Sequence, residues 1–112
     1  MSLINKFECD MITYFCHYLL TQNYKPEQIT ILTLYAAQSL EIKSSITEYK
    51  KAFLKPIRVF TVDNYQGEEN DIIILSLVRS NNENKIGFLK IPNRVNVALS
   101  RAKKGMYIFG NS

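Results

Sequence analysis

The chain has 112 residues, of which 46% are apolar and 12% aromatic, so it is long enough to bury one hydrophobic core. Its 14 basic and ten acidic residues give a net charge of +4. This excess suits a phosphate-bearing partner, but it is equally typical of an ordinary solvated surface. No apolar run is long enough to cross a membrane and no signal peptide begins the chain, so we expect a soluble intracellular protein.

The two cysteines predict neither a disulfide nor a metal site. Cys9 and Cys16 lie on one predicted helix, about 10 Å apart along its axis, which is too far for a disulfide bond. The single histidine, His17, and the absence of a Cys-x-x-Cys spacing exclude a zinc site built from this chain. We therefore expect buried free thiols in a reducing compartment.

Helical and strand patterns alternate along the chain. Apolar residues at steps of three and four predict a helix over about residues 8–20, with a packing stripe made of Phe7, Met11, Phe15, Tyr18 and Leu19. A β-branched run predicts a strand over 29–35, and helical spacing returns from 36 to about 53, with Ile42, Ile46, Tyr49 and Phe53 on one face.

The second half of the chain begins with two predicted strands, over 57–62 and 71–78. A polar loop spans 80–85, and a helix begins near Pro92 with a stripe of Val95, Ala98, Leu99 and Ala102. A last strand covers 106–109, after Gly105 as the C-cap of that helix. The strands are apolar on both faces, which predicts an α/β fold: a three-layer parallel sheet flanked by helices, formed by one domain over 1–112.

Polar residues follow two of the predicted strands. In open parallel sheets, ligands bind at the carboxyl ends of the strands, and we place the stretch from Thr61 to Glu69 at such an end. There, Gly67 allows a tight turn or a close approach to a ligand, Gln66 offers two donors and an acceptor, and Glu69 accepts hydrogen bonds from hydroxyls. The alternative is a solvated turn.

Tyr35 and Gln38 follow the first strand and are expected at the same edge, although either residue would also serve to cap the next helix. Tyr65 has two interpretations, stacking on a base or packing on its own domain.

The helix predicted to begin near Pro92 carries two arginines that suit a phosphate group. On a helix, Arg94 and Arg101 fall within about 20° of one another, at the margin of the packing stripe. A guanidinium held there by packing suits phosphate oxygens, because its planar fork offers five donors. Lys103 and Lys104 point elsewhere and form either a solvated basic face or a contact with a polynucleotide backbone.

Three stretches together resemble motifs V and VI of superfamily 1 helicases of the Upf type. They are Thr61-Val-Asp followed by Gln66-Gly-x-Glu69, then Asp71-Ile-Ile-Ile-Leu-Ser76, and Asn96-Val-Ala-Leu-Ser-Arg101-Ala. Ser76-Leu-Val-Arg79-Ser and Ile86-Gly-Phe-Leu89 are most similar to the zinc-finger-containing helicases of the NFX type. The resemblance covers essentially the whole chain, as the second, C-terminal RecA-like domain of such an enzyme.

The resemblance implies a role for particular residues. Glu69 would contact ATP, with Gly67 beside it, and Arg101 would be the catalytic arginine finger on the γ-phosphate. Tyr35, Gln38, Thr61 and Gln66 would lie near single-stranded RNA or DNA.

The resemblance also implies partners. An N-terminal RecA-like domain with the phosphate loop would form the other half of the ATP site and hold Mg²⁺, and the cytoplasm or nucleus would be the compartment.

The chain also departs from that pattern. At motif IV it has Thr33-Leu-Tyr-Ala-Ala-Gln38, without the usual Pro and Gly, and Lys103 stands where arginine is common. It contains no phosphate loop and no acidic metal-binding motif, so we expect the chain alone not to hydrolyse ATP at a useful rate. Two alternatives remain: a non-catalytic RNA- or protein-binding module derived from a helicase domain, and an unrelated nucleotide-binding enzyme on the same sheet.

Overall fold

The structure is a computed structural model, and it describes residues 4–50, 53–65, 67–78 and 93–110, apart from the side chain of Arg94. Its strands form one parallel sheet in the order β2-β1-β3-β4. They are β1 (Ile29–Thr33), β2 (Arg58–Thr61), β3 (Asn70–Ser76) and β4 (Ala102–Phe109).

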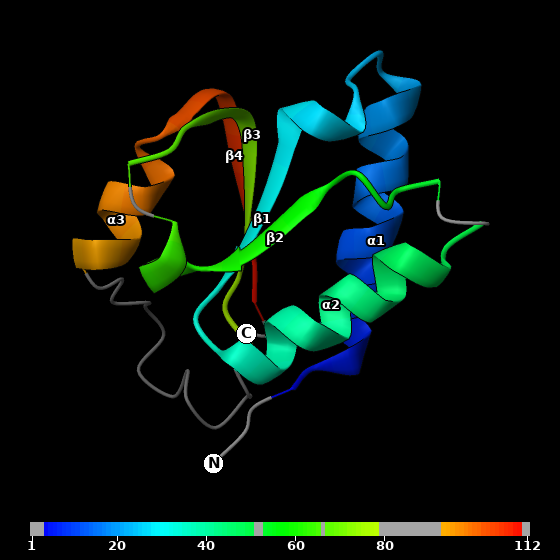
Figure 1. The fold of residues 1–112 in the computed structure, drawn as a ribbon, viewed down its shortest axis with the longest axis horizontal. Coiled ribbons are helices and arrows are strands. Elements are labelled where there is room, and N and C mark those ends of the chain that lie inside the picture. The colour runs from blue at the N-terminus through cyan, green and yellow to red at the C-terminus, as the bar shows by residue number, and fades with distance from the viewer. Residues whose placement is uncertain (1–3, 51–52, 66, 79–92, 111–112) are drawn as a thin grey trace.

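Helices cover both faces of the sheet: α1 (Lys6–Thr21) and α2 (Ala36–Glu48) lie on one face, and α3 (Asn93–Leu99) lies on the other (Figure 1). Short 3-10 helices, η1 (Pro26–Gln28) and η2 (Val62–Asn64), precede β1 and follow β2. The predicted α/β class, a parallel sheet between two helical layers, is confirmed.

The central strand β3 supplies both halves of the hydrophobic core. Successive side chains of a strand point to opposite faces, so Ile72 and Ile74 pack on the side of α1 and α2, whereas Ile73 and Leu75 pack on the side of α3. All four side chains are buried. An uninterrupted apolar strand is therefore explained by a sheet that is covered on both faces.

The helix α1 forms where its periodicity predicts it, but its predicted packing stripe is only partly right. Leu19 is buried and Phe15 packs against the core, whereas the other three members are exposed. The buried apolar face consists of Cys9, Ile12, Cys16 and Leu19. Of the predicted stripe, Phe7 is 73% exposed and Met11 is 45% exposed. Both faces carry apolar residues at helical spacing, and only the packing of α1 on the sheet decides between them.

Two predicted helix ends are also wrong. The helix α2 ends at Glu48 rather than near residue 53, and Tyr49 after it is extended. The helix α3 ends at Leu99, so Ala102 and Gly105 belong to β4, and Gly105 is not a helix C-cap. At Gly105, an added Cβ atom would lie 3.4 Å from the Ile72 side chain, which is an ordinary packing distance.

Both cysteines are free and buried on α1, as predicted. Burial raises the pKa of the Cys9 thiol to about 11 and that of the Cys16 thiol to about 12. In the described part of the chain, no helix is long and apolar enough to span a membrane. The predicted loop at 80–85, Pro92 and the stretch Ile86–Leu89 lie outside the described residues.

Candidate nucleotide and nucleic-acid edges

The predicted site residues lie at two opposite edges of the sheet. Thr61 ends β2 and pairs with Thr33 at the carboxyl edge, whereas Asn70 begins β3 and pairs with Ala102 at the amino edge. Because β2 and β3 are parallel, the chain between them must return to the amino edge. We expected the whole stretch from Thr61 to Glu69 at the carboxyl edge. Thr61 lies there, but the expectation is wrong for Gly67 and Glu69, which lie toward the amino edge.

The connection between β2 and β3 crosses the sheet on the face covered by α3. Val62 and Tyr65 are buried there in the same cluster as α3, and the Tyr65 ring lies 5.4 Å from that of Phe60. Of the two interpretations of Tyr65, packing on its own domain is the one observed. Gly67 follows with a φ of +74°, a left-handed conformation that favours glycine. Gln66 lies outside the described residues.

The amino edge brings Glu69 and Arg101 together. The amide of Asn70 donates to the carbonyl of Arg101 at 3.1 Å, so the residue that follows Glu69 is bonded directly to Arg101. Arg101 stands in the turn between α3 and β4 and not on the helix, so its predicted helical alignment with Arg94 is wrong. Its side chain is exposed to solvent at the start of β4.

Asn70 fixes this corner of the sheet. Its side-chain amide donates to the Thr30 hydroxyl at 2.9 Å and to the carbonyl of Glu27 at 3.1 Å, and its side-chain oxygen accepts from the amide of Asp71 at 2.8 Å. The starts of β1, β3 and β4 are thereby tied to one residue. The position of Glu69 beside Arg101 is thus set by backbone pairing and not by surface contacts.

Opposite charges alternate along the amino edge. The ion pairs are Lys103 with Glu69 at 3.2 Å, Arg58 with Glu68 at 3.5 Å and Lys104 with Asp71 at 3.9 Å. Between Asn70 and Ile72 the pairing with β4 shifts by one residue, so that Lys103 and Lys104 together stand opposite Asp71. Such exposed pairs stabilise the fold by only ~0–1 kcal/mol each, so they are easily exchanged for a ligand.

A pocket of about 470 Å³ opens next to this corner, between α3 and the start of β4. It is lined by Asn96, Leu99, Ser100, Ala102, Lys103, Lys104, Gly105 and Met106. Two ammonium groups, an amide and a hydroxyl beside apolar walls suit an anionic ligand with a partly apolar body. No cluster of three His, Cys, Asp or Glu residues that could hold a metal ion occurs in the described ranges.

The carboxyl edge carries the other candidate residues. Thr61 is partly exposed, and so is Tyr35, which is the N-cap residue of α2. Gln38 is fully buried: its amide oxygen accepts from the Asn5 amide at 3.0 Å, and its amide nitrogen lies 3.1 Å from the Ser76 hydroxyl. In this structure Gln38 is therefore engaged inside the domain, whereas Tyr35 and Thr61 remain open to a partner.

Sequence reasoning missed Glu8, although a signal for it was present. Asn5-Lys-Phe-Glu8 has the spacing of a helix capping box, and Asn5 does cap α1 by accepting from the Glu8 amide at 3.0 Å. The Glu8 carboxylate itself is buried and turns to the end of β3. The pairing of Lys103 with Glu69 was not predicted either, because it depends on the register of β4.

Known families and relatives agree with this architecture. A family model described as an AAA domain matches residues 1–112. The chain is 57% identical over 107 residues to mouse NFX1-type zinc finger-containing protein 1, covering 96% of this chain and 5% of the relative. It is 49% identical over 111 residues to the fission yeast helicase required for RNAi-mediated heterochromatin assembly 1, covering 99% and 11%.

The chain is also 40% identical over 117 aligned residues to fission yeast ATP-dependent helicase upf1, covering 98% of this chain and 12% of the relative. It thus spans about a tenth or less of the length of these proteins. The family match over the whole chain, the parallel sheet and these relatives lead to one conclusion: the chain belongs to the AAA domain family, as a helicase domain of the Upf type of superfamily 1.

Proposed function

We propose that this chain is the C-terminal RecA-like half of an ATP-dependent RNA or DNA helicase that works in the cytoplasm or nucleus. In the complete enzyme, its amino edge forms one wall of an interdomain ATP site, and its carboxyl edge contacts single-stranded nucleic acid. The observation that carries the proposal is that Glu69 and Arg101 stand next to the starts of two adjacent strands, where the amide of Asn70 donates to the carbonyl of Arg101.

The amino edge fits a nucleoside triphosphate in charge and in shape. Arg101 offers a planar fork of donors for phosphate oxygens, and Lys103 and Lys104 add positive charge around the neighbouring pocket. Glu69 accepts hydrogen bonds from hydroxyl groups, as a ribose would offer. Bound phosphate would compete with the exposed Glu69 carboxylate for Lys103, and little energy is lost in that exchange.

The chain supplies only part of such a site. It contains no phosphate loop, so the cradle for the phosphates and the ligands for Mg²⁺ would come from the N-terminal RecA-like domain. Arg101 would neutralise charge developing on the transferred phosphoryl group once the two domains close on the nucleotide. Closure and reopening would then move the two carboxyl edges relative to each other along the nucleic acid.

The experiment is a pair of titrations of the purified 112-residue chain. We expect weak ATP binding by calorimetry, because half of the site is missing. By fluorescence anisotropy we expect measurable binding of a single-stranded oligonucleotide that weakens steeply between about 50 and about 200 mM salt, as backbone contacts do. Tight ATP binding by the isolated chain, or no oligonucleotide binding at low salt, would contradict the proposal.

A further inference from the structure

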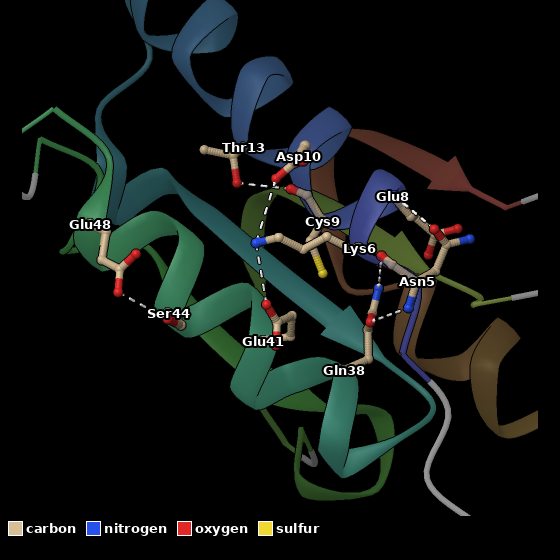
Figure 2. A network of polar contacts seen from close by, with 10 residues as sticks. All are labelled: Asn5, Lys6, Glu8, Cys9, Asp10, Thr13, Gln38, Glu41, Ser44 and Glu48. Carbon is tan, nitrogen blue, oxygen red and sulfur yellow. Dashed lines mark hydrogen bonds and ion pairs between the residues drawn. The ribbon is translucent and has the colours of Figure 1, made fainter.

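A closed polar network joins the start of α1 to α2 and to the end of β3. Figure 2 shows Asn5 bonded to Gln38 through its amide, at 3.0 Å, and through its carbonyl, at 3.3 Å. Gln38 also donates to the Ser76 hydroxyl at 3.1 Å, and that hydroxyl donates to the Glu8 carboxylate. The network is buried at its centre, where Glu8, Gln38 and Ser76 are each at most 4% exposed.

Within this network, Gln38 performs the task that a capping box gives to its acidic residue. In a capping box, the glutamate three residues after the N-cap accepts from the N-cap amide. Here the side-chain oxygen of Gln38 accepts from the Asn5 amide instead. The Glu8 carboxylate is thereby left for other partners, and it accepts from Ser76 and, at 3.1 Å, from the backbone amide of Val78.

Val78 has a backbone that its side chain disfavours. Its φ is +53°, in the left-handed region, which a β-branched residue rarely adopts. The preceding residue is fixed as well, because the amide of Leu77 donates to the carbonyl of Phe109 at 2.9 Å. A strained residue persists only when its surroundings determine its conformation, and among the described residues the Glu8 carboxylate is the group that accepts from the Val78 amide.

This strained end of β3 belongs to the carboxyl edge. Ser76 pairs with Thr33, which pairs in turn with Thr61, so the end of β3 lies in line with a candidate nucleic-acid residue. Tyr35 follows Thr33 by two residues and donates its amide to the Thr33 hydroxyl at 3.4 Å. The conformation of the chain at Ser76 and Val78 therefore bears on the shape of the surface that Thr61 and Tyr35 present.

We propose that Glu8 is a positioning residue: its buried carboxylate holds Val78 in the left-handed conformation and, through Ser76 and Gln38, fixes the carboxyl edge of the sheet for contact with the nucleic-acid backbone. The functional half of this inference rests on the proposed function. Glu8 does not touch the ligand in this account. It transmits the position of α1 to the edge, and Gln38 acts with it instead of binding nucleic acid.

The test compares Glu8→Ala with Glu8→Gln in the 112-residue chain. Glutamine keeps a side-chain oxygen that can accept from Val78 and Ser76, whereas alanine leaves both donors without it. Ile12→Ala is the matched control, since it destabilises the same helix from its core face. Two quantities are measured on each folded variant: the dissociation constant for a single-stranded oligonucleotide at fixed low salt, and the amide exchange and chemical shift of Val78.

We expect Glu8→Ala to weaken oligonucleotide binding by roughly fivefold or more and to expose the Val78 amide, with binding restored in Glu8→Gln and unchanged in Ile12→Ala. Wild-type affinity in Glu8→Ala, or equal losses in Glu8→Ala and Ile12→Ala, would overturn the positioning role while leaving the proposed function intact. A wild-type chain that binds no oligonucleotide would overturn the proposed nucleic-acid edge and this role with it. If the Val78 amide is unaffected in Glu8→Ala, the claim that Glu8 holds Val78 in its left-handed conformation is overturned.

Discussion

At the scale of single residues, the buried Glu8 carboxylate loses solvation but accepts hydrogen bonds from Ser76 and Val78. Burial raises the pKa of its carboxyl above the ordinary value of 4.5, and the hydrogen bonds from Ser76 and Val78 oppose that rise without cancelling it. An unfavourably buried charge is kept where it satisfies donors that would otherwise be buried and unpaired. Burial therefore disfavours the charged form of Glu8, although the carboxylate accepts hydrogen bonds from Ser76 and Val78 at the end of β3.

This balance predicts a pH dependence of stability. Because the folded state binds the Glu8 proton more tightly than the unfolded state does, the contribution of Glu8 to stability is largest below about pH 4.5 and declines as pH rises through the folded pKa. Glu8→Gln removes that slope. The measurement is urea unfolding of both proteins between about pH 4 and about pH 8, with Glu48→Gln as an exposed control. A constant difference between wild type and Glu8→Gln would contradict the prediction.

At the scale of elements, the helix α1 was correctly predicted, but the face that it buries differs in part from the predicted one. Both Phe7-Met11-Tyr18 and Cys9-Ile12-Cys16 follow helical spacing, and aromatic residues make the first set look more like a core. The second set is buried because that face of α1 packs in the core cluster against the sheet and α2. The boundary between α3 and β4 differs from the predicted one because pairing of Ala102 with Asn70 overrides the helical preference of an Ala- and Lys-rich stretch.

Neighbouring residues of α1 therefore differ sharply in their effect on stability. Ile12 is fully buried and Met11 is 45% exposed. We expect Ile12→Ala to lower the free energy of unfolding by about 2–5 kcal/mol, since it leaves a cavity in the core. Met11→Ala should cost about 1 kcal/mol or less, as is usual for exposed sites. Denaturant unfolding measures both, and equal losses would mean that the Met11 face is also packed.

At the scale of the whole molecule, the candidate site residues stand at two opposite edges of the sheet. Glu69 and Arg101 stand at the amino edge, whereas Thr61 and Tyr35 stand at the carboxyl edge. The two central strands between these edges, β1 and β3, are largely buried, and they join the edges through continuous backbone pairing. Two such domains around one nucleotide would convert closure into movement along a strand.

The prediction at this scale concerns a polypeptide that carries both the N-terminal RecA-like domain and this chain. Arg101→Ala there should lower ATP turnover by roughly 10³- to 10⁵-fold, because the developing charge loses its guanidinium partner. Arg101→Lys should recover little, since lysine lacks the planar fork. Lys43→Ala, an exposed cation on α2 away from this edge, is the control for a general loss of positive charge. ATP turnover at the wild-type rate in Arg101→Ala would exclude Arg101 as the arginine finger.

The sequence by itself determined the α/β class, the elements in order and the motifs that resemble a Upf-type helicase, because periodicity and local motifs are encoded in neighbouring residues. Only the tertiary structure decided which face of α1 is buried, where α3 ends, and that Glu69 meets Arg101 at the amino edge. The tertiary structure also shows that Gln38 is buried and joined to Glu8 through Ser76, where the sequence predicted an exposed residue. These features depend on strand order, register and burial, which arise from contacts between residues far apart in the chain.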